Sequence, residues 1–75
     1  MQIQLKLMGM LKAKTPPDGS LALSEGGTIE DVLQDLGIAA DAVHVFTVNG
    51  SLVRDRAHVL SDGDELTLLP PVGGG

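Results

Sequence analysis

The chain has 75 residues, enough for a single domain close to the lower size limit at which a hydrophobic core is stable without disulfides or bound metals. Ten acidic residues against five Lys and Arg give a net charge of −5, which argues against binding to nucleic acid or anionic membranes and favours a partner with a basic face. The absence of cysteine excludes disulfides and thiolate chemistry, and a single aromatic residue, Phe46, leaves no platform for stacking bases.

The N-terminal segment Gln2–Leu7 alternates polar and apolar residues, which predicts a strand with one buried face. This start is not an apolar signal core, and no apolar run is long enough to span a membrane, so we expect a cytoplasmic protein. The turn residues of Thr15–Gly19 then predict an antiparallel hairpin with a second short strand, Ser20–Ser24.

A helix is predicted over Ile29–Leu36. Thr28 is suited to the N-cap, Asp31 to the capping-box position, and Gly37 to the left-handed terminator. The apolar residues fall at i, i+3, i+4 and i+7 and form one stripe: Ile29, Val32, Leu33 and Leu36. Because no second helix of comparable length is predicted, this stripe must cover one face of a sheet.

The second half of the chain predicts a loop or a single helical turn over 38–42, followed by three strands. Asn49-Gly50 indicates a tight hairpin between the first two, and Ser61–Asp64 predicts a tight turn before the last. The predicted strands are Val43–Val48, Ser51–Val53 and Glu65–Leu69.

The element order is therefore β-β-α-β-β-β. This order is typical of an α+β protein with a β-grasp, ubiquitin-like arrangement, in which one main helix packs on one face of a mixed four- to five-stranded sheet. We expect the first and last strands to pair in parallel at the sheet centre, because both carry aliphatic alternation. The predicted organisation is a β-grasp domain of residues 1–69 and a flexible C-terminal tail of residues 70–75.

The C-terminal tail has little to bury. Pro70 and Pro71 end the last strand because proline supplies no backbone donor, and Gly73–Gly75 carry no side chains. Fully extended, residues 72–75 would reach about 13 Å beyond the body. A glycine thread of this kind can enter a narrow active site, because glycine permits a close approach of other groups. A frayed terminus is the alternative interpretation.

No set of side chains in the sequence forms a recognisable catalytic or metal site. His44 and His58 lie in different segments without further His or Cys ligands, and Gly26-Gly27 lacks a P-loop lysine and follows the acidic Glu25. We therefore expect no resident metal and no enzyme activity of the chain by itself. Three basic residues are candidates for an interface, with ordinary solvated charges as the alternative: Lys12, Arg54 and Arg56.

Three segments, Val48-Asn49-Gly50, Asp62-Gly63-Asp64-Glu65 and Leu69–Gly75, together resemble the ubiquitin-like sulfur carriers of the MoaD/ThiS family. The resemblance covers essentially the whole chain, and its most specific motif is Pro-Pro-Val before a terminal diglycine. The double proline is closer to MoaD, the molybdopterin synthase small subunit, than to ThiS of thiamine thiazole synthesis. The chain departs from the family at Gly73, where a small or polar residue is usual, and at Lys12-Ala13, where an Arg-Glu pair is common.

The resemblance implies a definite chemistry at Gly75. An adenylyltransferase of the MoeB/ThiF type would use ATP and Mg²⁺ to convert the Gly75 carboxylate into an acyl-adenylate. A sulfur donor, such as a cysteine desulfurase or a rhodanese, would then form a thiocarboxylate for a MoaE-like large subunit in molybdenum or tungsten cofactor synthesis. The resemblance assigns partner docking to the segment Pro70, Pro71 and Val72, and it matches Gly74 and Gly75 to the family's diglycine, so that Gly73 and Gly74 belong to the docking tail. Separately, alternation in the last strand places Leu66 and Leu68 on one face and directs Leu69 outward beside Pro70, where we expect it to contribute to the interface.

Three alternatives stay open at this point. The first is a ubiquitin-like modifier that is joined to lysines of other proteins through Gly75. The second is a sulfur carrier for another pathway, such as thiamine synthesis. The third is a non-catalytic β-grasp interaction module whose glycine tail is incidental.

Overall fold

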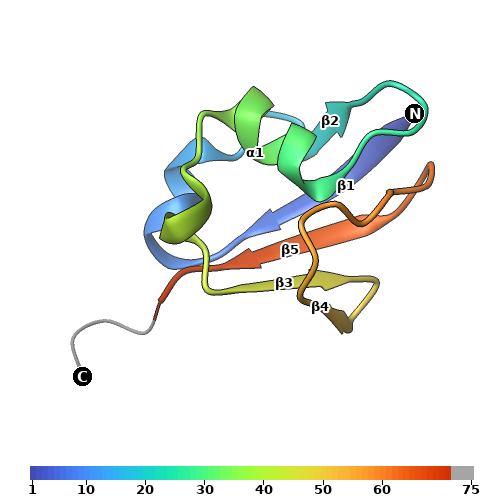
Figure 1. The fold of residues 1–75 in the computed structure, drawn as a ribbon. Coiled ribbons are helices and arrows are strands. Elements are labelled where there is room, and N and C mark those ends of the chain that lie inside the picture. Colours follow the sequence, from blue (N-terminus) through green and yellow to red (C-terminus); the bar gives the residue numbers. More distant parts are fainter. Residues whose placement is uncertain (72–75) are drawn as a thin grey trace.

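Residues 1–71, which the computed structural model describes, form a five-stranded sheet that is covered on one face by an α-helix (Figure 1). The strand order in the sheet is β2-β1-β5-β3-β4. The strands are β1 (Gln2–Leu7), β2 (Ser20–Ala22), β3 (Val45–Val48), β4 (Ser51–Val53) and β5 (Glu65–Leu69). The helices are α1 (Ile29–Leu36) and the short 3₁₀ helices η1 (Gly9–Lys14) and η2 (Ala40–Ala42).

The centre of the sheet is the parallel pair β1 and β5, in which Leu5 lies beside Leu66 and Leu7 beside Leu68. β2 pairs antiparallel with β1, and β3 pairs antiparallel with both β5 and β4. The predicted parallel pairing of the first and last strands is confirmed, and so is the α+β, β-grasp architecture with one main helix.

The core lies between α1 and the facing side of the sheet. Alternation along β1 and β5 directs Ile3, Leu66 and Leu68 into this layer, where their exposed fractions are 0%. Full burial of each such aliphatic side chain contributes about 1.5–3 kcal/mol to folding. The remaining buried apolar residues are Leu5, Leu7, Leu11, Leu23, Ile29, Val32, Leu33, Ile38, Val43, Phe46, Val48 and Leu60.

The structure confirms the predicted bounds of α1 and both of its caps. The Thr28 side chain accepts a hydrogen bond from the Asp31 N–H at 3.3 Å, and the Asp31 carboxylate accepts one from the Thr28 N–H at 3.0 Å. Gly37 ends the helix in the left-handed region, with φ of 70°. These local bonds fix where α1 begins and ends.

Two predicted strand boundaries were wrong, and one helix was not predicted. β3 begins at Val45, because the Val43 N–H is already bonded to the Ala40 carbonyl in the turn of η2, at 3.2 Å. β2 ends at Ala22, although the next residue, Leu23, is buried as expected. The segment Gly9–Lys14 forms η1, and its only buried residue is Leu11.

The predicted turn before β5 is held by its own carboxylates. The Asp64 carboxylate accepts hydrogen bonds from the Ser61 N–H at 2.8 Å and from the Asn49 side-chain amide at 2.9 Å. Asp62 accepts one from the Gln2 N–H at 2.7 Å. These carboxylates therefore close the end of the sheet opposite to the C-terminal end of β5. Within residues 1–71, no helix is long and apolar enough to cross a membrane.

Candidate functional site

The chain leaves the sheet at the C-terminal end of β5, between β1 on one side and β3 on the other (Figure 1). On the β1 side, the Met8 N–H donates to the Leu68 carbonyl at 3.1 Å. On the β3 side, the His44 N–H donates to the Leu69 carbonyl at 2.7 Å. Pro70 follows and has no N–H to continue the ladder, so the chain separates from the sheet at this residue. We call this point the exit.

The prolines of the exit differ in exposure. Pro70 is half-buried and Pro71 is exposed, and both lie outside β5. The predicted tail residues Val72, Gly73, Gly74 and Gly75 lie outside the described residues, so the assignment of the reactive carboxylate to Gly75 stays a prediction.

Leu69 lies on the face of the sheet that α1 does not cover, which we call the outer face. Its neighbours in β5, Leu66 and Leu68, are buried on the opposite face, as the alternation predicted. Leu69 is half-buried and lies opposite Val45 in the β3–β5 register, which places both side chains on the outer face beside the exit. The interface role of Leu69 stays a prediction.

The outer face carries further apolar surface next to the exit. Leu52 of β4 lies opposite Thr47 of β3 and is 55% exposed, and Met8, which follows β1, is 40% exposed. Thr67 of β5 lies opposite Thr47 in the middle of this face and is half-buried. Exposed apolar side chains that gather on one face are typical of a protein–protein contact surface.

The three predicted basic interface residues do not form one cluster. Lys12 is exposed on η1, which contacts both β1 and β5 on one side of the exit. Arg54 follows β4 on the other side and lines a hollow of about 280 Å³ together with His44 and Leu52. The Arg56 carbonyl accepts from the Glu30 N–H at 3.0 Å, which places this residue at the start of α1 rather than beside the exit.

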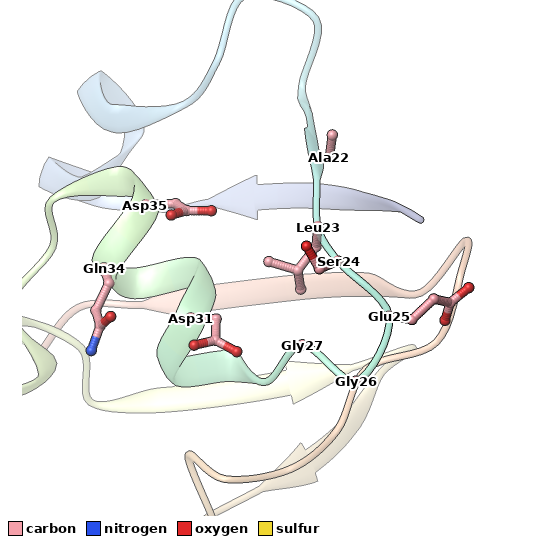
Figure 2. A pocket seen from close by; sticks show the side chains of 9 residues that line it. All are labelled: Ala22, Leu23, Ser24, Glu25, Gly26, Gly27, Asp31, Gln34 and Asp35. Atoms are coloured by element: carbon pink, nitrogen blue, oxygen red, sulfur yellow. The ribbon is translucent and has the colours of Figure 1, made fainter.

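A polar cleft of about 360 Å³ lies between α1 and the segment 22–27 (Figure 2). Figure 2 shows Asp31 and Asp35 extending from α1, while Glu25 points away from the helix. Carboxylates repel anions, so this cleft is unsuited to phosphate despite its adjacent glycines. Packing explains the glycine at position 27, because a Cβ there would lie 2.5 Å from the side chain of Leu23.

Metal binding finds no support in the part of the chain that the structure describes, where no three His, Asp or Glu residues are grouped closely enough to hold an ion. Asp31 is already engaged with the helix N-terminus. The exit with the adjoining outer face is therefore the best candidate for a functional site.

Sequence reasoning missed two residues of this site, Gly9 and His44. His44 contributes through its backbone N–H, which leaves no trace in the residue type. Gly9 lies two residues after the end of β1, where the polar-apolar alternation stops, and a glycine at such a point is the signal that could have drawn attention to it.

A parallel pair of β1 and β5 under one helix, with a proline-ended last strand, defines a ubiquitin-like β-grasp protein. A family model described as the ThiS family matches residues 5–75. The chain therefore belongs to the ThiS family, as its sequence resemblance indicated. No curated protein sequence gave a significant match.

Solved structures agree with this fold. SAMP1 of Haloferax volcanii, small archaeal modifier protein 1, is similar with a TM-score of 0.75 at 21% identity over 100% of both chains. The Haloferax volcanii HVO 2177 protein has a TM-score of 0.75 at 27% identity, covering 100% of this chain and 87% of that one. A chain of the complex of subunits 1 and 2 of molybdopterin-converting factor from Helicobacter pylori has a TM-score of 0.60 at 22% identity over 100% of both chains.

Proposed function

We propose that this protein is a sulfur carrier for molybdopterin synthesis, activated at the carboxylate of Gly75. The observation that carries the proposal is the ThiS-family match, which extends from residue 5 to residue 75 and so includes the tail. The exit supports it, because β5 ends at Leu69 and the chain turns away from the sheet beside an exposed apolar face. The chain acts as a carrier and has no enzyme activity of its own.

The chemistry follows from the reactivity of a carboxylate, which is a poor acyl donor until it carries a good leaving group. A Gly75 carboxylate oxygen attacks the α-phosphorus of Mg-ATP in a MoeB/ThiF-like adenylyltransferase, and pyrophosphate leaves. The terminal sulfur of a cysteine persulfide on a donor, such as a cysteine desulfurase or a rhodanese, then attacks the acyl carbon, AMP leaves, and an acyl disulfide forms. A thiol of the donor or of a small reductant attacks the donor's cysteine sulfur, forms a disulfide with it, and releases the Gly75 thiocarboxylate. ATP and Mg²⁺ belong to the partner, and the carrier itself contributes the carboxylate and the reach.

The receiving partner in this proposal is a MoaE-like large subunit. The similarity to a chain of the Helicobacter pylori complex of subunits 1 and 2 supports this partner. Both partners would dock on the outer face beside the exit, where Leu69, Val45 and Leu52 supply apolar surface next to the tail. Docking there would leave the tail free to enter the partner's active site.

The first prediction concerns the tail itself. Deleting Gly75 leaves Gly73-Gly74 as a new diglycine end that is about 3.3 Å shorter, whereas deleting both Gly74 and Gly75 removes the diglycine. We expect both variants to fold with unchanged thermal stability and to lose ATP–pyrophosphate exchange with the host adenylyltransferase. Exchange that persists in the double deletion would refute activation at this end.

The thiocarboxylate requires a mass measurement that methionine oxidation does not confuse, because both changes add nearly the same mass. Trypsin cleaves after Arg56, and the peptide that follows contains no methionine. A mass increase in this peptide, dependent on ATP and the sulfur donor, would identify the C-terminal thiocarboxylate.

A second candidate function is protein modification, which the similarity of the fold to SAMP1 favours. The variant Gly73→Arg distinguishes it, because trypsin would then leave only a Gly-Gly remnant on any lysine joined to Gly75. Lysines with this remnant in host proteins would support a modifier. A third possibility, an interaction module with an incidental tail, predicts that removal of Gly73–Gly75 changes no function.

A further inference from the structure

Gly9, the first residue of η1, lies directly against the exit. A Cβ built on Gly9 would lie 3.0 Å from Cγ and 3.8 Å from Cδ of Pro70. A side chain at this position would therefore press on the Pro70 ring, which would have to shift by a few tenths of an ångström. Gly9 also has φ of +56°, a backbone conformation that side chains disfavour. Two separate requirements for glycine coincide at this position.

The other glycines with positive φ in residues 1–71 meet only one of these requirements. A Cβ at any of them would have no heavy atom within 4 Å, so backbone conformation alone explains the glycine. These residues are Gly19, Gly26, Gly37, Gly50 and Gly63. The close approach of Pro70 therefore sets Gly9 apart.

The contact comes at the point where backbone hydrogen bonding ends. The Leu68 and Leu69 carbonyls are the last of β5 to accept bonds from Met8 and His44, and Pro70 has no N–H to donate. At this point the Pro70 ring lies against Gly9, beyond the last hydrogen bond of β5. Pro70 is half-buried, in agreement with a ring that packs against its neighbour.

We propose that Gly9 is a positioning residue for the tail. Because Gly9 has no Cβ, the Pro70 ring packs against the start of η1, a contact that we call the seat. The seat sets the direction of the chain at Pro70 and Pro71, from which the tail is presented to the activating enzyme. The proposal rests on the proposed function for its consequence in activation. The seat itself is a property of the free protein and can be measured without a partner.

The test uses four variants. Gly9→Ala adds the Cβ that meets Pro70. Gly50→Ala is the matched control, because Gly50 has φ of +84° with open space around it and lies at the opposite end of the sheet. Pro70→Ala removes the ring atoms, and Gly9→Ala with Pro70→Ala combines the added Cβ with the space to hold it.

In the free protein, we expect Gly9→Ala to change the one-bond Cα–Hα residual dipolar couplings of Pro70 and Pro71 while those of β1, β3 and β5 stay as in the wild type. Gly50→Ala should leave the couplings of both prolines unchanged. Unchanged couplings in Gly9→Ala, or equal changes in Gly50→Ala, would overturn the seat.

In activation, we expect Gly9→Ala to lower kcat/KM for ATP–pyrophosphate exchange about tenfold, since a reacting group displaced by about 1 Å can lose up to about a hundredfold in rate. The same Cβ should have no effect on kcat/KM in the Pro70→Ala background. An equal loss in Gly50→Ala or in both backgrounds would show that strain alone is responsible and would overturn the positioning role. If the wild type supports no exchange, the carrier function fails, and the couplings of the prolines alone then decide whether the seat exists.

Discussion

Thr15 has a hydroxyl that folding removes from water without giving it a hydrogen-bond partner in residues 1–71. Its backbone is satisfied, because the Thr15 N–H donates to the Lys12 carbonyl at 3.1 Å at the end of η1. A buried hydroxyl without a partner costs about 1–3 kcal/mol of desolvation. The Thr15 hydroxyl therefore lowers the free energy of unfolding.

The residue-scale prediction is that Thr15→Val stabilises the protein by about 1 kcal/mol, because a methyl group of similar size replaces the hydroxyl without needing a partner. Thr15→Ser is the matched control. It keeps the hydroxyl, loses the methyl group and should destabilise by about 1 kcal/mol. Urea unfolding with an unchanged m-value would measure both. A destabilised Thr15→Val would mean that the hydroxyl is hydrogen-bonded in solution.

Among the secondary-structure elements, α1 depends most on local sequence. The capping box of Thr28 and Asp31 satisfies backbone donors of the first turn, and Thr28 also forms an isolated antiparallel bridge with Val59. The start of α1 is therefore attached to the segment that precedes β5. Loss of the cap would loosen both.

The element-scale prediction is that Thr28→Ala lowers the free energy of unfolding by about 1 kcal/mol, the usual cost of removing an N-cap oxygen. Thr28→Ser keeps the oxygen and should lose no more than about half of that amount. Both can be measured by urea unfolding. Equal losses in the two variants would show that the methyl group, rather than the cap, matters at this position.

The same contrast between local and distant contacts explains what the sequence could predict. The predicted bounds of α1 were correct because the residues that cap the helix are its immediate neighbours in the sequence. The parallel pairing of β1 and β5 followed from aliphatic alternation in both. By contrast, η1 buries only Leu11 and has no apolar stripe, so the sequence contains no helical periodicity from which η1 could be predicted. The seat of Pro70 on Gly9 joins residues far apart in the chain and needs the folded sheet to bring them together.

At the scale of the whole molecule, charges of both signs lie on both sides of the sheet. Lys6 on the outer face, Lys12 on η1 and Arg54 after β4 lie on or near the surface around the exit. The acidic side chains of α1 lie on the other side of the sheet: Glu30, Asp31 and Asp35. A partner that approaches the exit therefore meets these basic side chains on an outer face that also carries Glu65, exposed at the start of β5. We therefore expect apolar contact to contribute more than charge to the proposed docking on the outer face.

The last prediction tests which side of the molecule docks, and two exposed apolar residues make a matched pair. Leu52 is 55% exposed on the outer face, and Val59 is 57% exposed beside the start of α1, bridged to Thr28. Leu52→Asp should weaken binding to the adenylyltransferase by about thirtyfold. A well-buried apolar contact contributes about 2 kcal/mol to the binding free energy, and a charged carboxylate buried in its place removes most of that contribution. Val59→Asp should change the dissociation constant less than about threefold.

Both variants remove a large exposed apolar side chain and add one negative charge, so a general effect of charge or of lost surface would weaken binding equally. Urea unfolding first checks that both variants are folded. Titration calorimetry of each variant with the adenylyltransferase then separates a general effect from one specific to the outer face. Equal weakening would remove the outer face as the docking surface, because the position of the added charge would then not matter. Selective weakening by Leu52→Asp would place the partner on the face where Leu69 and the exit lie, so that docking and entry of the tail into the active site occur from the same side.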